Sequence, residues 1–293
     1  MTEYPENSLP DQSIKNLLDE AVQTLQACDS ARLDAELLLC TVLQIERGQI
    51  YSRYNSDIPS DKIHTFRLLL DKRKEGCPVA YLTGHREFWS LDLHVNQHTL
   101  IPRPETECLV EAVLTAIPAN AEYSIADLGT GSGAIAIALA SERPACIVTA
   151  IDTCDCALTV AKLNAEHHNL NRIRFKQSNW FSDIQNTFDI IVSNPPYIRS
   201  GDEHLHTGDV AHEPVLALDG GKDGLNAIRI IITRSDDYIN PGGLLFIEHG
   251  YDQGGSVREL LKQHGYTGVK TLPDYAGLER ITFGKLIKNQ CAT

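Results

Sequence analysis

Residues 123–140 constrain the fold more than any other part of the chain. An apolar run over residues 123–128 is typical of a short buried strand, and it leads into a glycine-rich turn at residues 127–133. An apolar helix is predicted directly after the turn, over residues 134–140. A strand, a glycine-rich turn and a helix form the nucleotide-binding unit of doubly wound α/β folds. The segment therefore predicts an α/β domain built around a parallel sheet.

Strands and helices keep alternating through the rest of the chain. Apolar runs separated by helical patterns and turn residues favour a doubly wound, mostly parallel sheet with helices on both faces. The predicted strands cover residues 146–151, 172–177, 190–192 and 243–248, with a final antiparallel pair around 269–271 and 280–286. The predicted helices cover residues 157–166, 225–238 and 256–264.

The glycine turn restricts the ligand that the domain can bind. Its spacing is Gly-x-Gly-x-Gly from Gly129 to Gly133, whereas dinucleotide-binding folds carry Gly-x-Gly-x-x-Gly. Asp127 lies two residues before the first glycine, and its carboxylate would repel a pyrophosphate but attract a cationic amino-acid group. The turn therefore favours a cationic ligand over a dinucleotide.

Polar and aromatic residues follow the next two predicted strands. Asp152 ends the second strand, 19 residues beyond Gly133, where an acid can accept hydrogen bonds from both hydroxyls of a ribose. Trp180 follows the third strand, where its ring could cover an adenine. Taken singly, an Asp after a strand is commonly a helix cap and a Trp is commonly part of a core. Together, at the ends of successive strands, they predict a pocket for a ribose and an adenine without phosphate.

The fourth predicted strand ends at Asn194-Pro195-Pro196-Tyr197. The prolines cannot continue a central strand because they lack an N–H, and they stiffen the loop that follows. Asn194 offers a side-chain carbonyl and Pro195 a main-chain carbonyl, so the loop can accept both hydrogens of an NH2 group. Tyr197 adds a flat face against which an amide or base could stack. An ordinary strand-ending turn with a capping Asn explains the tetrapeptide by itself equally well, so the surrounding chain must decide.

Residues 11–76 show helical periodicity without a cluster of reactive side chains. Three amphipathic helices are predicted there: one through residues 14–25, one that Asp29 or Ser30 could cap, and one from Ser60 to Lys74 that Gly76 ends. Residues 87–95 alternate as in a short hairpin, and a helix is predicted near residues 108–116. We expect a small N-terminal helical domain at residues 1–77, a hairpin and linker at 78–107, and the α/β domain at 108–293.

Composition excludes several classes of protein. The formal net charge of −13 argues against binding nucleic acid mainly through phosphates. No apolar stretch approaches the roughly 20 residues that span a membrane, and the first ten residues do not match a signal peptide, so we expect a cytoplasmic protein.

The eight cysteines include no Cys-x-x-Cys pair, which favours reduced thiols. Glu203, His204, His206 and His212 share a loop without a second ligand cluster, so no metal site is predicted.

The residues also carry a family resemblance. The turn at residues 127–133, followed by Asn194 to Tyr197, resembles the class I S-adenosylmethionine-dependent amino-methyltransferases, a pair of motifs shared with adenine-N6 DNA methyltransferases. More specific are Arg86-Glu87-Phe88-Trp89-Ser90, Ile101-Pro102-Arg103-Pro104-Glu105-Thr106-Glu107, and Glu213-Pro214 with residues 218–225. With the helical N-terminus, these segments resemble the peptide-chain release factor glutamine methyltransferases over nearly the whole chain.

The resemblance implies a seven-stranded class I methyltransferase sheet and S-adenosylmethionine as cofactor. It also implies methylation of the side-chain amide nitrogen (N5) of the glutamine in the Gly-Gly-Gln motif of class I release factors. We expect the enzyme to be a monomer and its helical N-terminal domain to recognise the release factor. Carried over position by position, the cofactor would be bound by Asp127, Leu128, Gly129, Thr130, Gly131, Asp152, Trp180 and Asn194, and the glutamine amide by Asn194, Pro195, Pro196 and Tyr197, with Asn194, Pro195 and Tyr197 as the catalytic residues.

Two positions depart from the family pattern, and two other functions remain open. Asn179 stands where an acid is common, and His212 stands where an aromatic residue usually precedes Glu213-Pro214. An adenine-N6 methyltransferase would use the same loop but should carry a basic target-recognition region, which this acidic chain lacks. A dehydrogenase or a non-catalytic nucleotide-binding module would explain the glycine turn but not the loop at Asn194.

Overall fold

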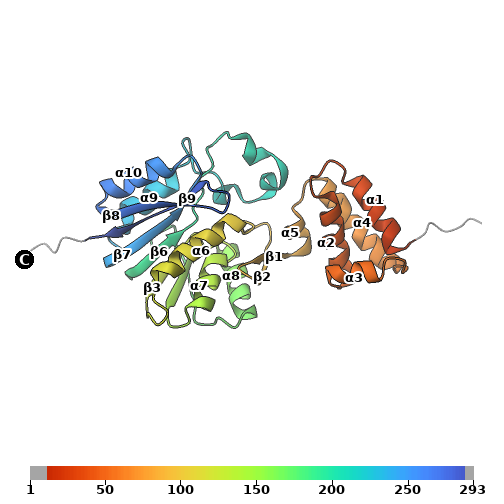
Figure 1. Cartoon of the computed structure of the whole chain (residues 1–293), viewed down its shortest axis with the longest axis horizontal. Helices are drawn as coiled ribbons and strands as arrows, with labels where there is room; N and C mark the ends of the chain where they lie inside the picture. The colour runs from red at the N-terminus through yellow and green to blue at the C-terminus, as the bar shows by residue number, and fades with distance from the viewer. Residues whose placement is uncertain (1–11, 288–293) are drawn as a thin grey trace, which may run out of the picture. The chain divides into compact units, whose positions relative to one another are not determined.

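The computed structural model of the chain describes residues 12–287, which divide into two compact units after Gly84. The N-terminal unit is helical (Figure 1). Apolar faces of its helices meet in one core around Leu18, Leu38, Leu39 and Phe66. Its helices are α1 (Ile14–Thr24), α2 (Ala31–Leu43), α3 (Arg47–Ser52), α4 (Ser60–Lys74) and α5 (Val79–Thr83).

The prediction of only three helices in this unit was wrong. α1, α2 and α4 match the predicted periodicity, but α3 and α5 are too short to show one. α3 begins at a capping box, in which the side chains of Glu46 and Gln49 bond each other's backbone. Ser30 is the N-cap residue of α2, as predicted, but its hydroxyl donates to Asp34 Oδ1 at 2.8 Å instead of accepting from the backbone. The predicted cap of α4 was wrong, because Pro59, not Ser60, is its N-cap residue.

The second unit contains a hairpin and a seven-stranded sheet. The hairpin pairs β1 (His85–Phe88) with β2 (Leu91–His94), as predicted. The sheet has the order β5-β4-β3-β6-β7-β9-β8, in which β9 alone runs antiparallel to its neighbours β7 and β8. Its strands are β3 (Ser124–Leu128), β4 (Ile147–Asp152), β5 (Arg174–Gln177), β6 (Phe188–Ser193), β7 (Ile239–Glu248), β8 (Tyr266–Pro273) and β9 (Glu279–Leu286).

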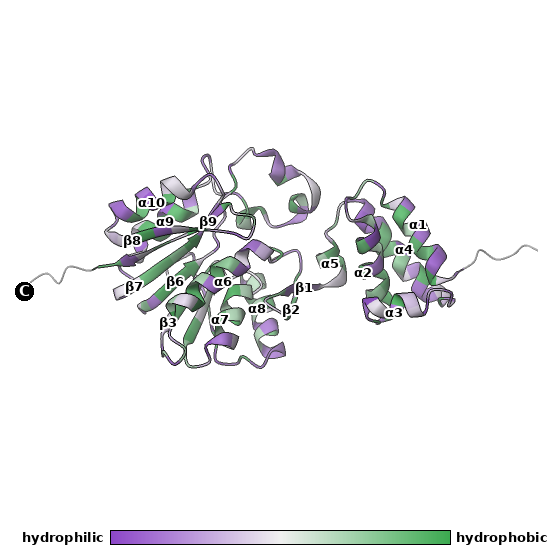
Figure 2. Ribbon diagram, in the orientation of Figure 1, coloured by the Kyte–Doolittle hydropathy of each residue, from purple (hydrophilic) through white to green (hydrophobic). Residues whose placement is uncertain are grey.

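Helices cover both faces of the sheet, so the predicted doubly wound, mostly parallel fold is confirmed (Figure 1). Successive residues of β6 alternate between the two cores: Ile190 and Val192 pack with α6 and α7, whereas Ile191 packs with α9 and α10. Figure 2 shows the strands largely in the hydrophobic colour, while the outer sides of α9 and α10 are hydrophilic. The helices are α6 (Pro104–Ala116), α7 (Ala134–Glu142), α8 (Asp155–His167), α9 (Asn226–Ser235) and α10 (Gly254–Gln263).

The strand order places the switch point of the fold between β3 and β6. After β3 the chain moves outward through β4 and β5, then returns to form β6 on the other side of β3. Open α/β sheets bind ligands at such a point, beyond the carboxyl ends of the strands. The Ser193 hydroxyl donates to the Leu128 carbonyl at 2.7 Å and ties these two strand ends together. The glycine turn (residues 127–133) and the Asn194 loop (residues 194–197) therefore begin side by side.

The loop between β6 and α9 is more ordered than its polar sequence indicates. It contains three short 3₁₀ turns, η1 (Glu203–His206), η2 (Gly208–His212) and η3 (Val215–Ala217). Among residues 12–287, no helix combines the length and the apolar character needed to cross a bilayer.

Candidate active site

The glycine turn after β3 has few backbone donors left for a phosphate. The N–H groups of Gly129 and Thr130 both donate to the Ile151 carbonyl, at 2.8 and 2.9 Å, and the Gly131 N–H donates to Asp152 Oδ2 at 2.9 Å. The N–H of Gly133 donates to Thr130. A pyrophosphate cradle instead points such groups at its ligand. The observed bonding therefore fits a ligand without phosphate.

Asp127 lies beneath this turn and is fully buried. Its Oδ2 accepts hydrogen bonds from the Thr130 hydroxyl at 2.6 Å and the Ala136 N–H at 3.2 Å. Its Oδ1 has no hydrogen-bond partner among the described residues. Burial raises the pKa of Asp127 to about 7, since a charged carboxylate is costly without water. A cationic group bound nearby would favour the ionised form.

Asp152 and Trp180 lie next to the same turn. Asp152, at the end of β4, also accepts from the Cys154 N–H through Oδ1, at 2.9 Å, so each carboxylate oxygen carries one backbone hydrogen bond and keeps a free lone pair. The half-buried Trp180 has a left-handed backbone, with φ of 54°. A Cβ on Gly129 would lie 3.6 Å from its ring, which is ordinary van der Waals contact, so the indole packs directly against the turn. The structure thus brings together Asp127, Gly129, Asp152 and Trp180.

Asn194 is held from one side by a residue of α6. Its side-chain nitrogen Nδ2 donates to the Thr106 hydroxyl at 3.0 Å. With Nδ2 turned toward Thr106, Oδ1 is the hydrogen-bond acceptor that Asn194 can offer to a ligand. Pro195 is buried, whereas Asn194, Pro196 and Tyr197 are partly exposed.

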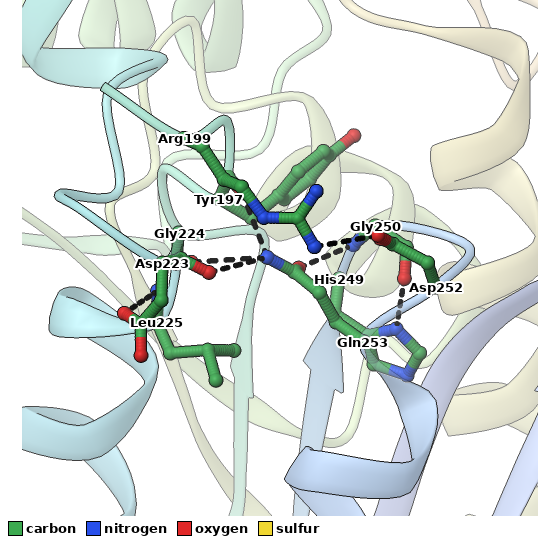
Figure 3. A network of polar contacts seen from close by, with 9 residues as sticks. All are labelled: Tyr197, Arg199, Asp223, Gly224, Leu225, His249, Gly250, Asp252 and Gln253. Atoms are coloured by element: carbon green, nitrogen blue, oxygen red, sulfur yellow. Dashed lines mark hydrogen bonds and ion pairs between the residues drawn. The ribbon is translucent and has the colours of Figure 1, made fainter. Parts of the chain in front are cut away.

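Gln253 links Tyr197 to the segments around Gly224 and Gly250, as Figure 3 shows. Its buried side chain donates to the Tyr197 carbonyl at 3.0 Å and accepts from the Gly250 N–H at 2.8 Å. Gly224 also packs against this loop, because a Cβ there would clash with the Tyr197 carbonyl and with the Gln253 amide. Ile198 pairs with Asp219, which anchors the loop's exit. The segment at residues 218–225 therefore forms the backing of the site.

A second buried acid lies on the other side of the loop. Glu248 ends β7 and is fully buried, and the Tyr197 hydroxyl donates to its Oε1 at 3.4 Å. Burial raises the pKa of Glu248 to about 7, against the opposing effects of the Thr106 hydroxyl and Arg280. Burial likewise raises the pKa of Tyr197. Sequence analysis missed Glu248 and Thr106, although an acid at the end of an apolar strand was a visible signal.

Two segments that carry the family resemblance meet at a single ion pair. The side chain of Glu213 is fully buried and pairs with Arg103, while its Oε2 accepts from the Ile101 N–H at 3.0 Å. The segment before α6 is thereby joined to the loop before η3. The histidines of that loop do not gather: no group of three His, Cys, Asp or Glu within residues 12–287 could hold a metal.

Comparison with known proteins agrees with this geometry. Residues 16–84 match the PrmC N-terminal domain, and residues 106–215 match the methyltransferase small domain. A solved methyltransferase from Pyrococcus furiosus superposes on 67% of this chain and 89% of its own, with a TM-score of 0.51 and 22% identity, which supports the fold alone.

Curated relatives are similar over nearly their full length. A release factor glutamine methyltransferase from Aliivibrio fischeri is 44% identical over 94% of this chain and 98% of its own. Those from Salmonella typhimurium and Escherichia coli are 48% and 45% identical, each over 92% of this chain and 97% of their own.

This chain is a class I methyltransferase that uses S-adenosylmethionine. The sheet order, the glycine turn whose N–H groups are already bonded within the protein, and the acids around that turn all fit this class. The match to both domains and the similarity to the curated relatives then identify the family within this class. The chain belongs to the release factor glutamine methyltransferase family.

Proposed function

We propose that this chain methylates the side-chain amide nitrogen (N5) of the glutamine in the Gly-Gly-Gln motif of class I peptide-chain release factors. The names of the relatives support the substrate class. The observation that carries the chemistry is the bond from Asn194 Nδ2 to Thr106, which leaves the Asn194 carbonyl oxygen to accept a substrate N–H. An NH2 group is the partner that two adjacent carbonyl acceptors fit.

The cofactor site follows from the geometry around β3 and β4. Asp127, Leu128, Gly129, Thr130 and Gly131 would line the turn, where the unpaired Asp127 oxygen suits a cationic ligand. The free lone pairs of the Asp152 carboxylate would accept from the ribose hydroxyls. Trp180 would cover the adenine, and Asn194 would border the cofactor at the end of β6.

The residues of the Asn194 loop promote the reaction by holding the substrate amide in position. When bound, S-adenosylmethionine supplies an electrophilic methyl group on a sulfonium sulfur. Asn194 Oδ1 and the Pro195 carbonyl accept the two amide hydrogens, Pro196 keeps the loop stiff, and Tyr197 stacks on the amide plane. Holding the hydrogens this way favours a pyramidal nitrogen and directs its lone pair at the methyl carbon. Such alignment can lower a barrier by several kcal/mol, up to about 10. As the nitrogen–carbon bond forms, the carbon–sulfur bond would break and leave a neutral thioether, and the nitrogen would then lose a proton to water.

The two units of the chain would have different roles. The helical N-terminal unit would recognise the folded release factor, and residues 85–293 would carry the methyl transfer. One monomer contains every proposed site residue. An adenine-N6 nucleic-acid substrate would present a similar NH2 group, but the names of the relatives and the net charge of −13 disfavour it.

Mass spectrometry of a release factor incubated with the enzyme and S-adenosylmethionine tests the function. We expect one added methyl group on the glutamine of the Gly-Gly-Gln motif, and none when that glutamine is replaced by glutamate. Methylation at another residue, or faster transfer to duplex DNA than to the release factor, would contradict the proposal.

A further inference from the structure

We propose that Gln253 is a positioning residue for the methyl transfer, which fixes the Asn194 loop through the main-chain carbonyl of Tyr197. This inference rests on the proposed function, because it assumes that the Asn194 loop holds the substrate amide. Gln253 is the buried N-cap residue of α10, and it lies 56 residues after Tyr197 in the sequence.

Both ends of the Gln253 amide face groups of fixed hydrogen-bonding character. Its Oε1 accepts from the Gly250 N–H at 2.8 Å, and an N–H can only donate. Its Nε2 donates to the Tyr197 carbonyl at 3.0 Å, and the carbonyl oxygens of Asp223 and Gly224 each lie 3.4 Å from the same nitrogen. A turned amide would place oxygen against oxygen and N–H against N–H. Only the orientation in Figure 3 satisfies all of these groups.

The NH2 group of Gln253 joins two segments whose carbonyl oxygens would otherwise repel each other. The carbonyl of Tyr197 belongs to the Asn194 loop, and the carbonyl of Gly224 belongs to the segment at residues 218–225. A buried carbonyl that loses its donor is costly, because no water replaces the missing hydrogen bond. Without the Gln253 amide, the Asn194 loop should therefore move away from this segment.

The buried His249 holds the other partner of Gln253 in place. Its Nδ1 lies 2.9 Å from the Gly250 carbonyl, which can only accept, so Nδ1 carries a hydrogen. Burial lowers the pKa of His249, which favours a neutral ring whose Nε2 accepts from the Thr282 hydroxyl at 2.7 Å. Thr282 lies on β9, so the Gly250 peptide is fixed to the sheet. Gln253 transfers this fixed position to the Asn194 loop.

An ion pair spans the same two segments on the outside of the protein. Arg199 follows the Asn194 loop and lies 2.6 Å from Asp252, as Figure 3 also shows. The two side chains are 51% and 40% exposed, and exposed ion pairs contribute little because water screens them. The buried amide of Gln253, rather than this ion pair, should therefore determine the position of the loop.

Replacement of Gln253 in the full-length enzyme tests this role. Gln253→Met keeps the length of the side chain but removes its donor and acceptor. Because a misplacement of about 1 Å can lower a rate about 100-fold, we expect kcat on intact release factor to fall about 10- to 100-fold. The Kd for S-adenosylmethionine should stay near that of the wild type, since the hydrogen bonds of Gln253 reach none of the proposed cofactor residues.

Two control variants alter neighbouring positions of the same segment. Gln263→Met makes the same change at the exposed end of α10, and Asp252→Asn removes the outer ion pair, so both should leave kcat nearly unaltered. Equal kcat for Gln253→Met and wild type would overturn the positioning role. A loss in Asp252→Asn as large as that in Gln253→Met would also overturn it, because the ion pair would then fix the loop.

Gln253→Glu adds a pH-dependent readout. A carboxylate at this position has no hydrogen to donate, and its charge would face the carbonyls of Tyr197 and Gly224. The protonated carboxyl can donate to Tyr197 and accept from Gly250, as the amide does, and burial raises the pKa of such a group. The kcat of Gln253→Glu, divided by that of the wild type at the same pH, should therefore rise between about pH 9 and about pH 6. The same ratio for Gln253→Met should stay constant. A ratio for Gln253→Glu that does not change with pH would contradict the role of these hydrogen bonds.

Hydrogen exchange without substrate separates this inference from the proposed function. The Ile198 N–H, next to Tyr197, donates to the Leu218 carbonyl at 2.9 Å. We expect this amide hydrogen to exchange faster in Gln253→Met than in the wild type, because the loop is no longer held. An unchanged exchange rate would contradict the positioning role of Gln253. Failure of the wild type to methylate release factor would contradict the proposed function, whatever the exchange rate.

Discussion

Asp152 combines two interactions in one side chain. Its oxygens accept from the N–H groups of Gly131 and Cys154, and its remaining lone pairs would accept from the hydroxyls of the ribose in the proposed site. We expect Asp152→Ala to weaken S-adenosylmethionine binding by on the order of 1.5–3 kcal/mol, because hydrogen bonds to a charged group are lost. Calorimetric titration measures this change. Asp155→Asn, which alters the charge nearby on the exposed start of α8, serves as control, and an unchanged Kd for Asp152→Ala would show that the ribose lies elsewhere.

Asn194 should be needed for turnover rather than for folding. Its side chain is partly exposed, and its Nδ2 makes one hydrogen bond to Thr106, so Asn194→Ala should leave thermal unfolding nearly unchanged. Turnover should be abolished, because one of the two acceptors for the substrate NH2 group is gone. Asn194→Asp keeps an acceptor but adds a charge beside the sulfonium, and we expect at most weak activity. Methyl transfer by Asn194→Ala at a rate near that of the wild type would contradict the proposal that Asn194 holds the substrate amide.

At the scale of elements, the loop that backs the site depends on a close backbone contact. Gly224 has φ of 76°, and a Cβ there would collide with the Tyr197 carbonyl and the Gln253 amide. Gly224→Ala should therefore displace the Asn194 loop and lower kcat at least about tenfold, the effect of losing roughly 1.4 kcal/mol of transition-state stabilisation. Gly201→Ala is the matched control. Gly201 has φ of 85° with nothing within 4 Å of its Cβ position, so it should cost only about 1–2 kcal/mol of stability and spare kcat. Similar kcat losses in both variants would point to backbone strain alone.

The elements also show what the sequence could predict. The ends of β3, β4 and β6 were predictable because apolar strands stop at polar or glycine residues, and parallel strands align their carboxyl ends at one edge. Asp127, Asp152 and Asn194 follow from that rule. Thr106 does not, because its contact with Asn194 joins positions 88 residues apart, and a Thr in the first turn of a helix carries no sign of its partner. α3 was missed for a related reason: six residues held by a capping box and a buried Ile50 show no periodicity.

At the scale of the whole molecule, the boundary between the units defines where the chain can be divided. The predicted boundary lay at residue 77, but α5 belongs to the N-terminal unit, where Leu82 packs against its core. Residues 85–293 contain the sheet, both of its cores and every proposed cofactor residue. A chain that starts at His85 should therefore fold and bind S-adenosylmethionine with an affinity close to that of the full-length protein.

The shortened chain should nevertheless lose most of its activity on intact release factor, because the proposed recognition unit is gone. A short Gly-Gly-Gln peptide can reach the Asn194 loop without that unit, so we expect it to be a poor substrate for full-length and shortened enzyme alike. Methyl transfer to intact factor, peptide and duplex DNA is compared for both proteins, with circular dichroism and cofactor titration as controls for folding. Equal activity of the two proteins on intact factor would contradict the recognition role of the N-terminal unit and leave the site assignment standing. Transfer to DNA that exceeds transfer to release factor would instead overturn the substrate, because both candidate substrates present an NH2 group to the same loop.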